Sequence, residues 1–147
     1  MASSEVIDAV VARLQTFLAT NPVARPEGSV WPLIKPDEES APPSDGGSFI
    51  SLQFPAGSED MITAGGSIGH RLVREVGVIR LIVSVPQGNG QSIGLAMINA
   101  LRGQFRYAEF SVVRTFGASP AVNNNDNDNG AWWVLSSAIT YWFDFTA

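Results

Sequence analysis

The chain has 147 residues, of which 45% are hydrophobic and only 16% are charged, and its formal net charge at pH 7 is −5. This length suits one domain with one core, and a charged fraction well below the usual value of about 25% favours apolar surface that a partner covers, so we expect oligomerisation. The nine basic residues are scattered from Arg13 to Arg114, which argues against a DNA-reading surface, and the absence of cysteine excludes disulfides and thiolate chemistry.

The first residues carry neither the basic segment nor the apolar segment of a secretory signal. The apolar runs fall far short of the roughly 20 residues that a membrane helix needs. The sequence therefore predicts a soluble protein that is made in the cytoplasm.

Residues 4–19 are expected to form a helix that packs on the core. Ser4 is the expected N-cap, Glu5 is favourable in the first turn, and Asn21-Pro22 ends the segment. Apolar residues recur at helical spacing on one face: Val6, Ile7, Val10, Val11, Leu14, Phe17 and Leu18.

Residues 22–47 are rich in turn-forming residues, with six prolines and three glycines. Within them, only 30–34 could form a strand, and Pro32 would confine this strand to the edge of a sheet. The stretch 35–47 is too polar and too rich in proline to pack, so we expect a flexible loop there. A short strand is expected at 49–54.

Residues 68–85 are dense in β-branched side chains, and Gly77 lies in their middle. The pattern predicts either one long strand that bends at Gly77 or two strands that meet there. The half from 78 to 85 is nearly all apolar, which predicts a central strand that is covered on both faces. The stretch from Pro86 to Gly90 ends the strand, and a second helix is expected at about 91–105.

Two more strands are expected, at 110–113 and at 132–145. The loop 117–130 between them contains an Asn/Asp-rich tract, and we expect it to be flexible as well. The order of helix, two or three strands, helix and two strands predicts one α+β domain over 1–147. Its mainly antiparallel sheet would have about four to five strands, with both helices packed on it.

We expect no catalytic residue. His70 is the only histidine, and no serine stands in a nucleophile-elbow context. The glycine-rich turn Gly88-Asn89-Gly90 lies between a strand and a helix, as phosphate-binding loops do. Its glycine spacing fits neither the dinucleotide-binding fingerprint nor the P-loop, so it predicts a tight turn and no cofactor.

The Asn/Asp-rich tract partly matches a calcium-binding EF-hand loop. Asn125, Asn127, Asn129 and Gly130 stand at matching positions, but Ser136 replaces the bidentate glutamate that closes such a loop. No metal site is therefore expected.

Aromatic residues concentrate in the last strand, at Trp132-Trp133 and Tyr141-Trp142-Phe143. Adjacent strand residues point to opposite faces, so both faces of this strand are aromatic. One face supplies the core. The other needs cover, either from a second helix layer or from a neighbouring subunit.

Taken in order, these segments resemble the tail terminator (tail-completion, head–tail joining) proteins of long-tailed bacteriophages. The resemblance covers most of the chain: the amphipathic first helix, the turn Val30-Trp31-Pro32 and the strand 49–54. The most specific part runs from Arg74 to Gly90 and into the helix ending at Phe105. The segment from Trp132 to Asp144 is similar to the family's last strand, which has an aromatic-Asp finish.

The resemblance implies a structural virion protein at the head–tail interface, not an enzyme. Members of this family form rings, typically hexamers, that cap the tail tube, stop its growth and offer a docking surface to the head. The implied partners are further copies of the chain, the tail-tube protein and the head connector, while genomic DNA passes through the lumen without specific binding. Candidate structural or interface positions are Trp31, Gly77, Pro86, Gly88, Gly90, Phe105, Trp132 and Trp142.

Two alternatives stay open. The chain could be another head–tail connector, a head-closure protein or a tail-tube protein. It could also belong to a different class, as a small ligand-binding or hydrolytic α+β domain that uses the turn 86–92. A convergent polar pocket would distinguish this second class.

Overall fold

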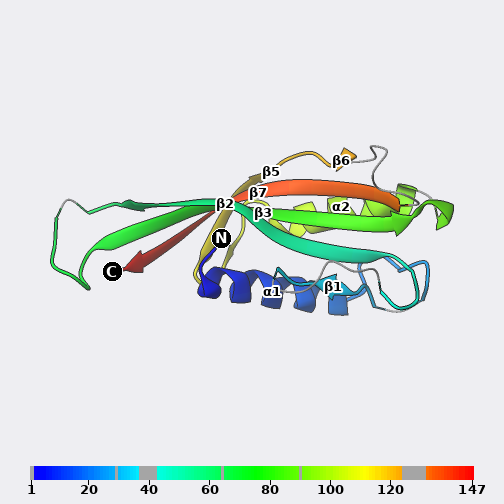
Figure 1. The fold of residues 1–147 in the computed structure, drawn as a ribbon, viewed down its shortest axis with the longest axis horizontal. Coiled ribbons are helices and arrows are strands. Elements are labelled where there is room, and N and C mark those ends of the chain that lie inside the picture. Colours follow the sequence, from blue (N-terminus) through cyan, green and yellow to red (C-terminus); the bar gives the residue numbers. More distant parts are fainter. Residues whose placement is uncertain (1, 29, 37–42, 64, 90, 124–131) are drawn as a thin grey trace.

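The computed structural model describes residues 2–28, 30–36, 43–63, 65–89, 91–123 and 132–147. The elements are α1 (Ser4–Ala19), β1 (Leu33–Ile34), β2 (Phe49–Met61), β3 (Leu72–Pro86), the 3-10 turn η1 (Gln87–Asn89), α2 (Gln91–Phe105), β4 (Glu109–Phe110), β5 (Val113–Ala118), β6 (Val122–Asn123) and β7 (Trp132–Thr146). Figure 1 shows their arrangement, with both helices beside one long sheet.

The described strands form one seven-stranded sheet in the order β1-β2-β3-β7-β5-β4, and β6 also pairs with β7. β1 runs parallel to β2, and the other pairs are antiparallel. The α+β expectation is confirmed, but the sheet is mixed and has more strands than the expected four to five. β1 lies within the possible edge strand 30–34 and stands at the edge of the sheet, which confirms that expectation over Leu33–Ile34. β4 and β6 were not expected as separate strands, and each is two residues long, too short to show any alternation of apolar and polar residues.

Both helices cover the same face of this sheet. Alternate residues of β3 point to that face and are fully buried: Ile79, Leu81, Val83 and Val85. A Cβ added to Gly94 of α2 would lie 3.1 Å from Val85 and 3.2 Å from Leu135 of β7. The buried residues of α1 belong to the same core: Val6, Val10, Leu14 and Leu18.

The opposite face of the sheet, which we call the open face, is covered by neither helix. It carries the even-numbered residues of β3 and β7, and β3 residues such as Val78, Arg80 and Ile82 are only half-buried. β3 is central, between β2 and β7, as expected. The expectation that it is covered on both faces is wrong, because its apolar run faces helices on one side only.

The first helix has the expected bounds, but its N-cap is Ser3 and not Ser4. Ser3 makes no side-chain capping bond to the helix. Its hydroxyl and its backbone N–H instead donate to the carboxylate of Glu75 in β3. The start of α1 is therefore fixed by a contact 72 residues away along the chain, which local sequence cannot reveal.

β2 is longer than the strand expected at 49–54. It pairs with β3 from Phe49, opposite Ser84, to Met61, opposite Val73. Pro55 lies within the register shift between Gln53 and Ala56, where its missing N–H interrupts no regular ladder.

The outer half of this hairpin projects from the body of the molecule (Figure 1), and we call residues 55–74 the arm. Residues 55–62 and 65–71 of the arm are all exposed. The end of β7 pairs along it, with Thr146 opposite Leu72. The outer part of β2 was missed because an exposed strand has no buried face and therefore no apolar period.

The expected strand 110–113 is two strands joined by a tight turn. β4 and β5 meet at Ser111-Val112, where Ser111 has a φ of 51°. The expectation of a loop over 117–130 is wrong in its first part, because β5 extends to Ala118 and β6, at Val122–Asn123, pairs with β7. The remaining part, 124–130, lies outside the described residues.

None of the helices in the described part of the chain is long and apolar enough to cross a membrane.

Candidate interaction surfaces

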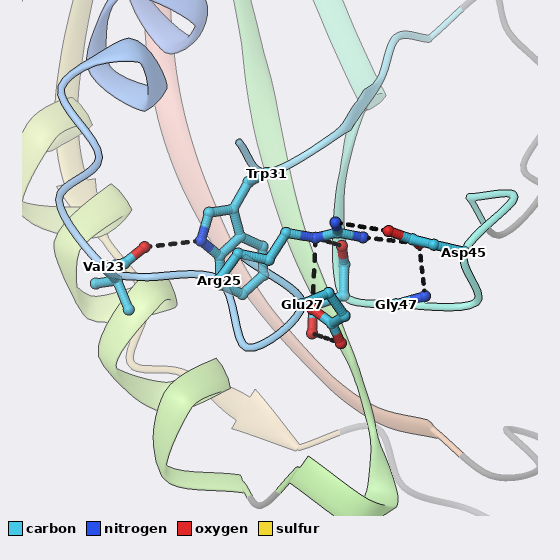
Figure 2. Close-up of polar contacts among 7 residues, drawn as sticks. Val23, Arg25, Glu27, Trp31, Asp45 and Gly47 are labelled. Atoms are coloured by element: carbon cyan, nitrogen blue, oxygen red, sulfur yellow. Dashed lines mark hydrogen bonds and ion pairs between the residues drawn. The ribbon is translucent and has the colours of Figure 1, made fainter. Parts of the chain in front are cut away.

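A buried arginine fixes the segment between α1 and β2 (Figure 2). Arg25, with 4% of the residue exposed, donates from Nε to the Ser48 carbonyl at 2.9 Å and from Nη1 and Nη2 to Asp45 at 2.8 and 3.0 Å. Glu27 lies 3.5 Å from the same guanidinium. The Arg25 hydrogen bonds, followed by the N–H of Gly47, lower the pKa of Asp45.

This arrangement corrects the expectation of a free loop at 35–47, because the end of that stretch is held to the body. A Cβ at Gly47 would lie 2.5 Å from Cγ of Glu27 and 2.7 Å from Nη2 of Arg25, so any larger residue would have to displace these side chains. Trp31 contributes to the same anchor. Its indole N–H donates to the Val23 carbonyl at 2.8 Å, and 2% of the residue is exposed, so Trp31 is a core residue (Figure 2). Residues 37–42 lie outside the described part.

A second buried polar cluster lies where the arm leaves the body. Glu75, with 4% exposed, accepts a hydrogen bond from the Tyr141 hydroxyl at 2.7 Å, in addition to the two bonds from Ser3. Burial, followed by the bond to Glu75, raises the pKa of Tyr141 far above its ordinary value. The cluster joins α1, β3 and β7 at one point, which we call the arm root.

Gly77 makes the arm root possible. It pairs in register with Gly57 and with Tyr141, so β3 is one continuous strand without a bulge at Gly77, and the register shift lies in β2 instead. A Cβ at Gly77 would lie 2.6 Å from the Tyr141 hydroxyl and 2.7 Å from its ring. The missing side chain therefore lets the tyrosine ring lie across the strand and reach Glu75.

The open face carries a cation–aromatic cluster. The guanidinium of Arg74 lies 3.7 Å from the ring centroid of Trp142 and donates to both oxygens of Asp144, at 2.7 and 2.9 Å. Trp142 also makes an edge contact with Phe116, with centroids 4.6 Å apart, and Arg114 lies 5.7 Å from the Phe116 ring. The bond to Arg74 lowers the pKa of Asp144.

The other predicted positions are separated in the fold. Pro86 pairs with Trp132 at the start of β7, and the Trp132 ring makes an edge contact with Phe49 at 5.4 Å. Phe105 is fully buried at the end of α2. Gly88 is exposed in the turn before α2, and Gly90 lies outside the described residues. The seven described positions therefore do not converge on one site.

A groove of about 760 Å³ runs along the outer side of α1. Its apolar lining comes from Phe17 of α1 and from Phe110 and Val112 of the β4–β5 hairpin. Glu5 and Asp8, both exposed, stand at the same groove. Sequence reasoning assigned Phe17 to the core face of the helix and did not predict the groove, because β4 and β5 were not separated.

His70 is exposed on the arm. Within the described ranges, no group of three or more His, Cys, Asp or Glu side chains is placed to hold a metal ion. The arm root and the Arg25 anchor are held by hydrogen bonds and an ion pair among their own residues. The features left facing outward are the arm, the open face and the groove.

The fold is similar to those of known structures. A chain that carries no functional name is 18% identical, with 100% of this chain and 99% of that chain covered and a TM-score of 0.61. A chain from the virion of a native gene transfer agent particle is 16% identical, with 98% and 100% covered and a TM-score of 0.57. No protein-family model matches this chain, and no curated protein matches it in sequence. At these identities the likeness establishes a shared fold over the whole chain.

Proposed function

We propose that this chain is a structural subunit of a phage or phage-derived virion, and that within it the chain acts as a tail terminator. In this role, copies form a ring, typically a hexamer, that caps the tail tube, ends its polymerisation and joins the tail to the head. The role is structural and requires no catalysis.

The observation that carries the proposal is the fold shared over nearly the entire chain with a chain of a gene transfer agent virion. The resemblance of the sequence to tail terminators, from the first helix to the aromatic last strand, points in the same direction.

The open face and the arm support self-assembly. The aromatic residues on the second face of β7 were expected to be covered by helices or by a neighbouring subunit, and neither described helix covers them. A subunit whose complementary surfaces differ forms head-to-tail contacts, and these close into rings with two unlike faces. A terminator needs two such faces, one for the tube and one for the head.

Deleting the gene from its phage tests this role. We expect filled heads without attached tails, together with free tails of abnormal and variable length, in electron micrographs. Complementation with the wild-type gene should restore both attachment and length. Tails of uniform, normal length in the deletion would exclude termination, and if such tails were unattached, the chain would be a head connector instead.

A further inference from the structure

We propose that the tip of the arm, residues 61–63 and 65–71, of one copy binds the groove along α1 of the next copy. This contact deepens the proposed function, on which it rests, by naming the two surfaces that would join neighbouring subunits of a ring. The partner is a second copy of this chain.

The arm tip carries apolar side chains that are largely exposed in the described part of the chain. Ile68 is 86% exposed, Met61 is 54% exposed and Ile62 is 45% exposed. Figure 1 shows the arm pointing away from α1, so its tip is remote from the groove of its own chain. Exposed apolar side chains at the end of a projecting hairpin are typical of a surface that binds a partner.

The tip has a defined shape. Gly65, Gly66 and Gly69 have φ angles of 85°, 109° and 88°, which L side chains rarely adopt. Nε of Arg71 donates to the Gly66 carbonyl at 2.9 Å and closes the turn. This turn presents Ile68 to solvent at the end of strands that span roughly 20 Å from Pro55 to Met61, at about 3.3 Å per residue.

The groove offers an apolar floor of suitable size. Its volume of about 760 Å³ can take several side chains, and Phe17, Phe110 and Val112 line it. Arg13 does not block the floor, because its guanidinium donates to the Gln104 carbonyl at 3.1 and 2.8 Å and stacks 4.8 Å from the Phe110 ring.

The charges of the two surfaces are complementary. The segment 62–71 contains His70 and Arg71 and no acidic residue, while Glu59 and Asp60 lie just before it on β2, where Asp60 is opposite Arg74. At the groove, Glu5 and Asp8 are exposed, and neither takes part in any of the ion pairs of the described residues. The basic lining residue Arg13 is held by the Gln104 carbonyl and the Phe110 ring. Opposite charges at the rim of such a contact favour one register and one partner over others.

The arm tip and the groove are different surfaces of the same chain, so the contact is head-to-tail. Each copy would offer its arm to one neighbour and its groove to the other. Repetition of this contact produces either a closed ring or a helical filament, and closure depends only on the angle between successive copies.

Site-specific cross-linking tests the contact, because the chain has no cysteine of its own. Ile68→Cys protein is mixed with Ala12→Cys protein, in which the new thiol lies in the groove, and a short bis-maleimide is added. The matched control mixes Ile68→Cys with Leu95→Cys, on a part of α2 that is exposed but outside the groove. We expect at least fivefold more cross-linked dimer from the first mixture, and equal yields would overturn the contact.

Charge reversal gives an independent readout by sedimentation of the full chain. Arg71→Glu should weaken self-association about fivefold, and the double variant Arg71→Glu with Asp8→Arg should recover most of the loss. If circular dichroism shows that both variants are folded and the double variant does not regain self-association, Arg71 and Asp8 do not face each other in the contact.

The outcomes separate the two proposals. If phage tails are normal in the gene deletion while the arm–groove cross-link forms, the terminator role fails and the contact stands. If the deletion gives the terminator phenotype while the cross-link does not exceed its control, the contact fails and the role stands.

Discussion

Glycine suits position 77 because the ring of Tyr141 occupies the space that a side chain would need. At this position glycine serves packing and not flexibility, since the strand is regular there and pairs with neighbours on both sides. The hydroxyl that reaches across Gly77 satisfies Glu75, a buried carboxylate that would otherwise be costly in an apolar core.

We therefore predict that Gly77→Ala lowers the free energy of unfolding by about 1–3 kcal/mol, because the methyl group would push the Tyr141 ring away from Glu75. Urea denaturation measures this change. Gly57→Ala is the matched control, since a Cβ there would meet only the Val76 carbonyl, at 3.7 Å, and should change stability by no more than about 0.5 kcal/mol. Equal effects of the two substitutions would show that the ring is free to move.

Residue-scale prediction from sequence had a clear limit here. Gly77 was singled out as a special position, but the expected reason was a bulge or a bend, because a glycine within a strand usually marks a break in regularity. The true reason is a tyrosine 64 positions later in the chain, and no local pattern contains that information. Arg25, Glu75 and Ser3 were missed on the same grounds.

At the scale of elements, the segment from Val23 to Ser48 shows how an irregular stretch is ordered without regular secondary structure. Arg25 holds this segment in place by binding the Ser48 carbonyl and the carboxylates of Asp45 and Glu27, where a helix or a sheet would be held by backbone hydrogen bonds. This anchor positions Trp31 in the core and leads the chain into β1, which pairs with β2.

The anchor should make stability depend on pH through Asp45. Its folded pKa lies below its unfolded value, so the carboxylate stabilises the fold above the unfolded pKa of about 4, and this contribution is lost as pH falls through the folded pKa. We predict that Asp45→Asn lowers the melting temperature at pH 7 and that the gap to wild type narrows below pH 4. Thermal melts at several pH values measure this difference in melting temperature, and Asp60→Asn, which changes an exposed acid of β2, is the control. A gap that stays constant from pH 7 to pH 3 would contradict the role of Asp45.

At the scale of the whole molecule, the body and the arm contribute different properties. The core lies between the two helices and one face of the sheet, and the arm beyond Pro55 adds little to it, since residues 55–62 and 65–71 are exposed. An exposed hairpin of this length does not increase the stability of the subunit, which points to a role between subunits.

We predict that replacing residues 63–71 with Asn-Gly leaves the unfolding free energy within about 1 kcal/mol of wild type, because this two-residue turn suits the hairpin register and almost no buried surface is lost. Self-association, measured by sedimentation, should fall to the background level. Loss of folding in this variant would show that the arm supports the core. Unchanged association would place the subunit contact elsewhere.

The sequence alone determined those features that repeat along a single element. The 3.6-residue period located α1 and α2 within a residue or two, and the β-branched run located β3 as the central strand. Composition and order together indicated one α+β domain, because each of these signals is local and is read from neighbouring positions.

Only the tertiary structure decided the rest. Contacts between segments that are distant in sequence decide the pairing of β2 beyond residue 54, the short strands β4 and β6, the arm root and the groove. An exposed strand has no apolar face, so its sequence shows no alternation of apolar and polar residues. A buried ion pair, or a glycine beneath an aromatic ring, can be recognised only when the partner residue is known. The interactions that cause these features exist only in the folded chain.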